Sequence, residues 1–140
     1  MKIICLLFLF AFSSLAQTES GEIKLIINDT KTDSGIIRIL IFNQAEGFPE
    51  EPKKALKALS IPVKNSSAQT TIRGLPSGTY AISVFHDEDE DGLFKKNSFG
   101  LPKDSYGFSN NPSLFFGPPS FSKCKVEVNN KPVLVEIILK

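Results

Sequence analysis

The 140-residue chain carries 16 Lys and Arg against 15 Asp and Glu, so its formal net charge at pH 7 is +1. This balance gives no general attraction to nucleic acid or to an anionic lipid surface, and the length suits one folded domain. Only one of the two cysteines, Cys124, lies beyond the apolar N-terminal segment, which excludes a disulfide-stabilised scaffold.

The N-terminal segment has the pattern of a secretory signal peptide. A basic start is followed by an apolar run over residues 3–12 and by small residues that end at Ala16. The apolar run is about half as long as the ~20 residues that a membrane-spanning helix needs. We therefore predict a signal peptide over residues 1–16 and one mature domain over residues 17–140 without a membrane span. This predicts export to the periplasm, the cell surface or the medium, and an uncleaved anchor is the alternative.

The rest of the chain has a hydrophobic period of two, which is typical of β-strands. Seven segments show this alternation or a weaker form of it: residues 22–27, 36–42, 61–63, 69–73, 80–86, 123–128 and 133–139. Residues 36–42 are apolar on both faces, as in a strand that is buried on both sides. Cys124 is in phase with Val126 and Val128, so we expect a buried and unreactive thiol. Strands at this spacing, separated by Gly, Pro and Asn, predict an all-β sandwich or barrel.

Two local features refine this fold prediction. The charged stretch near residues 50–60 contains Pro52 among good helix formers, and it predicts a short helical insertion of one or two turns. The segment from Gly74 to Tyr80 is a tight turn that leads into a strand, as in the tyrosine corner of Greek-key sandwiches. The sequence therefore predicts an immunoglobulin-like or transthyretin-like Greek-key β-sandwich of about seven strands.

The acidic run after residues 80–86 begins like a calcium-binding loop. Carboxylates stand at its first, third and fifth positions and a glycine at its sixth: Asp87, Asp89, Asp91 and Gly92. Three carboxylates on alternate residues can surround one hard cation if the chain turns sharply, and glycine permits that turn. The backbone carbonyl of Leu93 falls at the seventh position, where an EF-hand supplies a carbonyl ligand.

The remainder of this loop departs from an EF-hand. Lys95 occupies the ninth position and Ser98 the twelfth, where a bidentate Glu is expected, and no helical pattern flanks the loop. Asp104 or a carbonyl of the following loop can supply a missing ligand. Two interpretations therefore stay open, which are a solvated acidic tip and a calcium site built from Asp87, Asp89, Asp91, Leu93 and Asp104.

His86 is the single histidine of the chain, and it ends an apolar strand. Beside Asp87 and the hydroxyls of Ser105 and Ser109, it suggests a small secreted hydrolase in which His86 acts with Asp87 or Asp104. No Gly-x-Ser-x-Gly or similar nucleophile motif is present. A hydrogen-bonded structural histidine is therefore the favoured interpretation, and no catalytic residue is assigned.

Four blocks of the sequence match a pattern that a known family shares. The longest runs from Gly74 to Gly92, and residues 41–49, 99–110 and 119–121 supply the others. With these blocks the chain resembles domain of unknown function family 2141 over nearly the whole mature domain. The resemblance implies an exported bacterial protein with no established activity.

The resemblance also bears on the acidic loop. The family pattern often has Asn at the positions of Asp89 and Asp91, which conserves an oxygen ligand, and it usually has Asp at the position of Lys95. The lysine of this chain therefore removes one candidate ligand and adds a cation, which disfavours calcium binding.

These patterns together predict an exported, non-enzymatic β-sandwich module that binds a protein or a small ligand, and not nucleic acid. The acidic loop and the aromatic segment 106–116 are expected to form one end of the sandwich, because rigid scaffolds carry binding residues on their loops. Calcium is the cofactor that the acidic loop suggests, and no organic cofactor is expected. The secreted hydrolase that uses His86 is the alternative.

Overall fold

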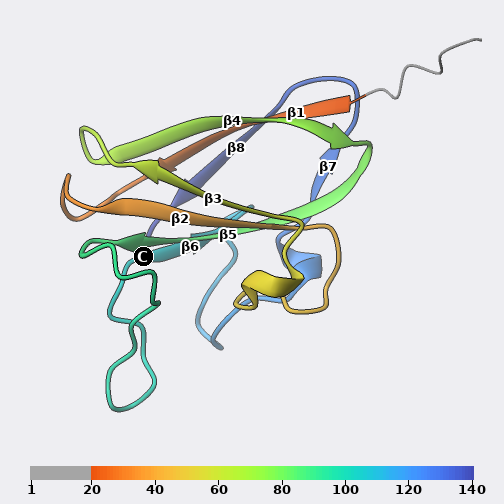
Figure 1. The fold of residues 1–140 in the computed structure, drawn as a ribbon. Coiled ribbons are helices and arrows are strands. Elements are labelled where there is room, and N and C mark those ends of the chain that lie inside the picture. The colour runs from red at the N-terminus through yellow and green to blue at the C-terminus, as the bar shows by residue number, and fades with distance from the viewer. Residues whose placement is uncertain (1–19) are drawn as a thin grey trace, which may run out of the picture.

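The alternating apolar and polar residues form eight β-strands in the computed structural model, which describes residues 20–140 (Figure 1). The strands are β1 (Ser20–Asn28), β2 (Ile36–Phe42), β3 (Lys57–Pro62), β4 (Ser67–Pro76), β5 (Gly78–Asp87), β6 (Tyr106–Phe108), β7 (Val126–Val128) and β8 (Val133–Ile138). Two single-turn 3-10 helices lie in the loops, η1 (Pro52–Lys54) and η2 (Phe121–Lys123). No helix in this described part is long and apolar enough to cross a membrane. The predicted signal peptide and its cleavage site after Ala16 lie outside the described residues.

The strands form an all-β sandwich of two sheets, which confirms the predicted fold class. One sheet has three strands in the order β4-β1-β8, and the other has five, in which β3-β2-β5-β6 are neighbours and β7 also pairs with β5. The two sheets lie one above the other in Figure 1. β1 and β8 run parallel, whereas the other pairs are antiparallel.

The main core fills the space between the sheets. It consists of inward-facing side chains that are at most 8 % exposed, among them Ile23, Leu25, Ile27, Ile37, Ile39, Ile41, Ile82, Val84, Val135 and Ile137. Burying one side chain of this size contributes ~1.5–3 kcal/mol, so such a core can support the fold without a disulfide. The prediction that β2 is buried on both faces is only partly right, because Ile36, Arg38 and Leu40 on its outer face are half-buried.

β5 is buried on both faces instead. On its outer face, Ala81 packs with Phe108 and Cys124 in a second apolar cluster beneath the loops. Cys124 is fully buried, as expected, but it follows η2 and joins this outer cluster, whereas Val126 belongs to the main core. The predicted strand register at Cys124 is therefore wrong, because the 3-10 turn before it rotates its side chain to the other side of the sheet. Burial raises the pKa of the Cys124 thiol to about 11, which keeps it protonated and unreactive.

The insertion near residues 50–60 is helical for one turn only. The chain leaves η1 and enters β3 at Lys57, where it pairs antiparallel with β2. Leu59 and Ile61 of β3 pack against the main core. The pairing with β2 and the burial of these two side chains outweigh the helical propensity of the Lys and Ala residues in this stretch.

The turn between β4 and β5 is a tyrosine corner, as predicted. The Tyr80 hydroxyl donates a hydrogen bond to the Pro76 carbonyl oxygen at 2.7 Å, and Tyr80 is 3 % exposed. Burial raises the pKa of Tyr80 above its ordinary value of 10.0. The corner fixes the start of β5, the strand that leads to the acidic loop.

Candidate cation site

Asp87 is the last residue of β5, and its side chain is fully buried. Its Oδ2 atom accepts hydrogen bonds from Arg38 Nε and from the Gly92 backbone N–H, each at 2.9 Å. Burial raises the pKa of the Asp87 carboxyl, but these hydrogen bonds and the guanidinium charge outweigh burial and hold that pKa below its ordinary value of 3.8. Asp87 is therefore a carboxylate at neutral pH.

The second oxygen of Asp87, Oδ1, is buried and has no hydrogen-bond partner among residues 20–140. A buried carboxylate oxygen has lost its water, so it destabilises the fold until a donor or a cation reaches it. The structure brings Asp87 together with Asp89 and Asp91, because one oxygen of each carboxylate lies within 4.8 Å of the other two. Asp89 and Asp91 are exposed, so solvent and ions can reach the group from one side.

The Lys95 ammonium group lies against two of these carboxylates. It contacts Asp89 Oδ2 and lies 3.1 Å from Asp91 Oδ2. Its hydrogen bonds to Asp89 and Asp91 raise the pKa of Lys95 above its ordinary value of 10.5. Lys95 is therefore a tethered counter-ion, and a metal ion that binds Asp89 and Asp91 has to displace it.

The loop turns sharply between the carboxylates. Glu90 and Gly92 both have a positive φ, of 58° and 79°. Glycine adopts this backbone conformation without steric cost, and it lets the Gly92 N–H point at Asp87. The Leu93 N–H donates to Asp91 Oδ1 at 2.9 Å, which orients that carboxylate.

The two other expected ligands take part in backbone hydrogen bonds of the loop. The Leu93 side chain is 65 % exposed, and its backbone contact with Asp91 runs through the N–H. Asp104 Oδ2 accepts a hydrogen bond from the Lys95 backbone N–H at 2.7 Å, and Asp104 is not one of the three converging carboxylates. Asp104 therefore positions the backbone of the tethered lysine.

Two residues that the sequence analysis did not single out position the loop. Arg38 reaches Asp87 from the neighbouring strand β2, and its Nη1 atom also donates to Ser60 at 3.2 Å. Gly35 packs against the start of the loop, since a Cβ atom there would lie 2.3 Å from the Asp87 carbonyl oxygen and 2.5 Å from Glu88 Cα. A lone arginine in the apolar run of β2 was the available signal for Arg38.

The His86 ring is buried and lies against the backbone of residue 34. The ring is 1 % exposed, and Nε2 lies 2.7 Å from the Ser34 carbonyl oxygen, so Nε2 carries the proton and donates it. The Ser109 hydroxyl donates to the Cys124 carbonyl at 2.5 Å and accepts from the Ile82 N–H at 3.0 Å. The Ser105 carbonyl oxygen accepts a hydrogen bond from the His86 backbone N–H at 2.8 Å. No hydrogen bond within residues 20–140 joins His86 to a serine hydroxyl.

A family model described as an uncharacterized protein conserved in bacteria (DUF2141) matches residues 25–136. The chain belongs to this family. The matched region contains the tyrosine corner, all of β5 and the whole acidic loop, which confirms the resemblance seen in the sequence. No curated protein and no solved structure matches the chain.

The aromatic segment of this DUF2141 domain divides into two parts. Tyr106 and Phe108 pack with the outer cluster beneath β5, so they support the fold. Phe115 and Phe116 are 85 % and 95 % exposed. β6 pairs with β5 and carries Tyr106 and Phe108 into this cluster, so Phe115 and Phe116 are the aromatic side chains of the segment that stand in solvent.

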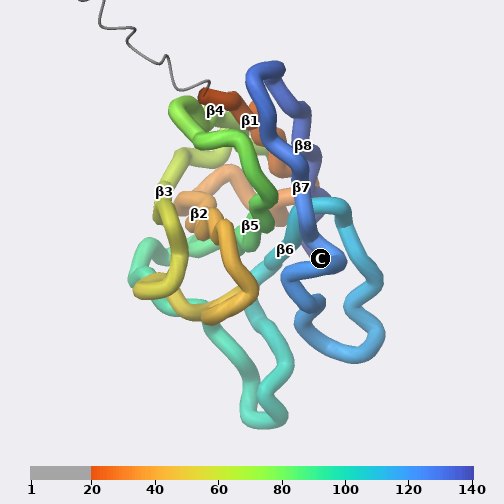
Figure 2. The backbone as a smooth tube through the Cα atoms, turned by 90° about the vertical axis from the view of Figure 1, so that its right-hand side faces the viewer, coloured from red at the N-terminus to blue at the C-terminus, as the bar shows by residue number. Residues whose placement is uncertain are grey.

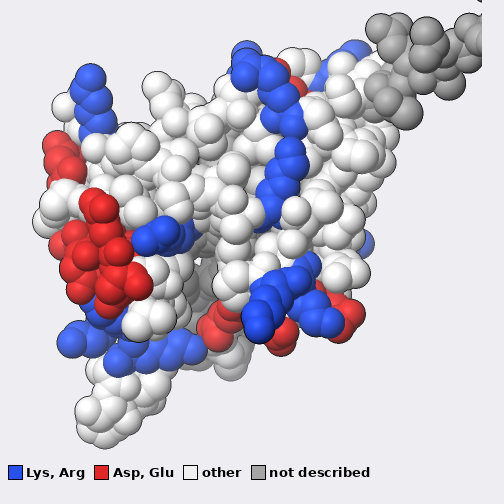
Figure 3. All heavy atoms as spheres, in the orientation of Figure 1, with Lys and Arg blue, Asp and Glu red and all other residues white. Residues whose placement is uncertain are grey.

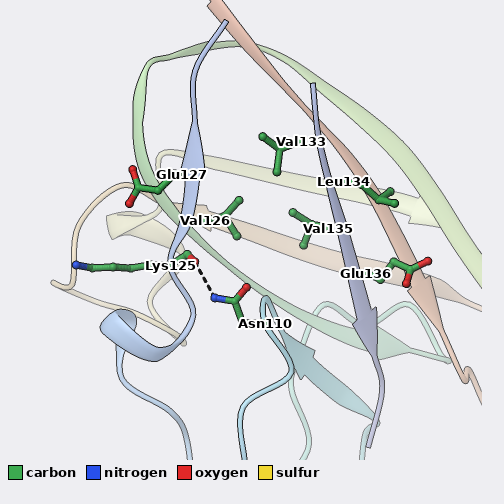
Figure 4. A pocket seen from close by; sticks show the side chains of 8 residues that line it. All are labelled: Asn110, Lys125, Val126, Glu127, Val133, Leu134, Val135 and Glu136. Carbon is green, nitrogen blue, oxygen red and sulfur yellow. Dashed lines mark hydrogen bonds between the residues drawn. The ribbon is translucent and has the colours of Figure 1, made fainter. Parts of the chain in front are cut away.

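A surface pocket of about 310 Å³ lies elsewhere on the DUF2141 domain, between β7 and β8 (Figure 4). Its floor is made of Val126, Val133 and Val135, and the Asn110 side chain donates to the Lys125 carbonyl oxygen at 2.7 Å. The pocket contains none of the acidic-loop residues. It is a shallow groove between two strand edges, and its lining offers no convergent set of groups for chemistry.

Proposed function

We propose that this chain is an exported, non-enzymatic binding module whose acidic loop binds calcium through Asp87, Asp89 and Asp91. The observation that carries the proposal is Asp87 Oδ1, a buried carboxylate oxygen that has no hydrogen-bond partner among the described residues. The Asp87 carboxylate that carries it is one of three that converge. Calcium takes 6–8 oxygen ligands at ~2.3–2.6 Å in flexible geometry. The trio offers Asp87 Oδ1 and the oxygens of Asp89 and Asp91, since Asp87 Oδ2 accepts from Arg38 and Gly92. Backbone carbonyls or water complete such a set.

The charge balance around the loop favours a divalent cation. Asp87 is paired with Arg38, while Asp89 and Asp91 share Lys95, so three carboxylates face two positive charges. When calcium displaces the Lys95 ammonium, two charges replace one and the group becomes neutral. The displaced ammonium returns to water easily, because exposed ion pairs are weak. Competition with Lys95 makes a modest affinity the expected result, with a Kd of ~10⁻⁴–10⁻³ M.

The burial of His86 supports a non-enzymatic module over the hydrolase alternative. A general base has to reach the proton that it removes, whereas His86 is 1 % exposed and already donates to Ser34. Asp87 Oδ2 accepts hydrogen bonds from Arg38 and Gly92, and Asp104 Oδ2 accepts one from the Lys95 backbone N–H.

Calcium should stabilise the protein against heat. With a Kd of about 1 mM, 10 mM calcium adds ~1.4 kcal/mol to the free energy of unfolding, which is about 5 °C in Tm for a domain of this size. Magnesium should do much less, because it demands a tighter octahedral site. Thermal melts with a chelator, with calcium and with magnesium measure the effect. Equal Tm values under the three conditions would leave the loop as a solvated acidic tip.

Three variants separate a calcium site from a general salt effect. Asp89→Ala should lose most of the calcium-dependent shift, because it removes the ligand oxygens together with their charge. Lys95→Gln should strengthen calcium binding several-fold, because it removes the competing ammonium. Lys96→Gln is the matched control, since its ammonium pairs with Glu50 at 3.2 Å instead. A calcium response that is the same in Lys95→Gln and Lys96→Gln would contradict the assigned site.

Export has its own test in the native host. We expect the envelope or secreted fraction to contain a chain that begins at Gln17, because small residues ending at Ala16 follow a short apolar run. Intact mass and N-terminal sequencing read this directly. A chain in that fraction that retains Met1 would refute cleavage.

A further inference from the structure

We infer that the hairpin of residues 94–104 docks on an anionic lipid bilayer, with Phe99 and Leu101 inserted at its surface. This hairpin projects beyond the rest of the molecule in two perpendicular views (Figures 1 and 2). Phe99 is 90 % exposed and Leu101 is 61 % exposed. Two large apolar side chains thus stand in water on the same projecting turn. The inference does not depend on calcium.

Most backbone donors at the tip of this hairpin have acceptors within the hairpin. The Phe99 and Leu101 N–H groups donate to Asn97 Oδ1 at 2.9 and 3.0 Å, and the Gly100 N–H donates to the Asn97 carbonyl at 2.9 Å. Residue 102 is a proline and has no N–H, and the N–H of residue 103 donates to the carbonyl of residue 95 at 2.9 Å. Backbone donors without partners are costly in an apolar medium. From residue 99 to residue 103, every backbone donor already has an internal acceptor.

Basic residues surround the base of the apolar tip. Lys95, Lys96 and Lys103 stand where the two arms of the hairpin meet, since Lys96 bridges to Pro102 and the Lys103 N–H bonds to Lys95. Figure 3 shows uncharged atoms at the lower end of the molecule, Lys and Arg atoms above them, and the acidic cluster farther from the tip. Lysines at this level reach lipid phosphates while the apolar tip enters the bilayer. Lys95 is paired with Asp89 and Asp91 and Lys96 with Glu50, and these exposed ion pairs are weak enough to exchange a carboxylate for a lipid phosphate.

A second loop supplies another apolar contact on the same side. Phe115 and Phe116 are 85 % and 95 % exposed, and their rings meet edge to face with centroids 4.9 Å apart. The Gly117 N–H donates to the Leu114 carbonyl at 3.1 Å, which closes the turn that presents them. This loop and the hairpin both extend downward in Figures 1 and 2. A flat lipid surface accepts two separate tips without a matching groove, which favours lipid over a protein partner.

Vesicle binding by the purified mature chain tests this inference. All samples contain a chelator, so a failure of calcium binding does not affect the result. We expect co-sedimentation with vesicles of phosphatidylcholine and phosphatidylglycerol, and weaker binding to phosphatidylcholine alone or at high salt. The double variant Phe99→Ser/Leu101→Ser should bind roughly thirtyfold more weakly, because it removes two inserted side chains. Leu134→Ser is the matched control, because Leu134 is 60 % exposed on β8.

A tryptophan reporter gives the depth of the contact. The chain has no tryptophan, so Phe99→Trp introduces a single fluorophore. Its emission should shift to shorter wavelength on anionic vesicles and be quenched by brominated lipid, whereas Leu134→Trp should show neither change. Absence of vesicle binding in the wild-type chain would overturn the inference, as would equal binding by the double variant. A dimer that the double variant disrupts, without vesicle binding, would show that a second copy covers the tip instead.

Discussion

Replacing Arg38 with methionine should destabilise the protein by about 2–3 kcal/mol at pH 7, because a fully buried carboxylate then loses its counter-ion. Methionine conserves most of the apolar stem of arginine, so the loss reports mainly the interaction with Asp87. The estimate lies below the full value for a buried pair, since the Arg38 side chain is 30 % exposed. Urea unfolding of the wild type and the variant measures the difference.

The pH dependence identifies the cause of this loss. In the wild type, the folded-state pKa of Asp87 is held below its ordinary value, so its contribution to stability is present above about pH 4 and disappears as the pH falls through the folded-state pKa. In Arg38→Met the buried carboxyl prefers its protonated form. The stability difference between the two proteins should therefore begin to shrink above pH 4, where the variant carboxyl takes up its proton, and shrink further below pH 4, where wild-type Asp87 is protonated. A difference that stays constant from pH 7 to pH 3 would assign the effect to packing.

Replacing Ser109 with alanine should cost about 3 kcal/mol, because two buried backbone groups lose their partner. The Ser109 hydroxyl is fully buried, where it accepts from the Ile82 N–H and donates to the Cys124 carbonyl. It thereby ties β5 to the segment after η2. Chemical denaturation measures the loss, and Ser113→Ala, an exposed serine in the same loop, is the control. Equal stability of the two variants would refute the structural role of Ser109.

The strands and the acidic loop could be predicted because their signals are local. The alternation of apolar and polar residues within β1 and β8 predicts that Ile27 and Ile137 face the core, and this prediction does not require knowing which strands pair. The spacing of Asp87 and Asp91 likewise brings carboxylates together as soon as Gly92 turns the chain. The tyrosine corner also spans a few residues, from Pro76 to Tyr80.

The supports of the loop could not be predicted because they come from distant parts of the chain. Arg38 and Asp87 are 49 residues apart and meet only after β2 pairs with β5. A second pairing explains why the helix near residues 50–60 is short, since β3 adds to the edge of β2 that β5 leaves free. Cys124 shows the opposite error, where a regular alternation hid a 3-10 turn that moves the thiol to another cluster.

The structure gives Lys95 a role that the sequence does not indicate. In the sequence it occupies a ligand position and adds a charge of the wrong sign for a calcium ligand. In the structure its ammonium lies between Asp89 and Asp91, so it stabilises the loop when no metal is bound. In the proposed function, calcium exchanges with this ammonium group, and we expect that competition to set the affinity.

A crystal structure of the mature chain grown with 10 mM calcium tests the central claim most directly. We expect an ion with oxygen ligands at ~2.3–2.6 Å, bound to Asp87 Oδ1 and to the carboxylates of Asp89 and Asp91, with the Lys95 ammonium displaced into solvent. A Lys95 ammonium that still bridges Asp89 and Asp91 under these conditions, with no ion beside Asp87 Oδ1, would contradict it.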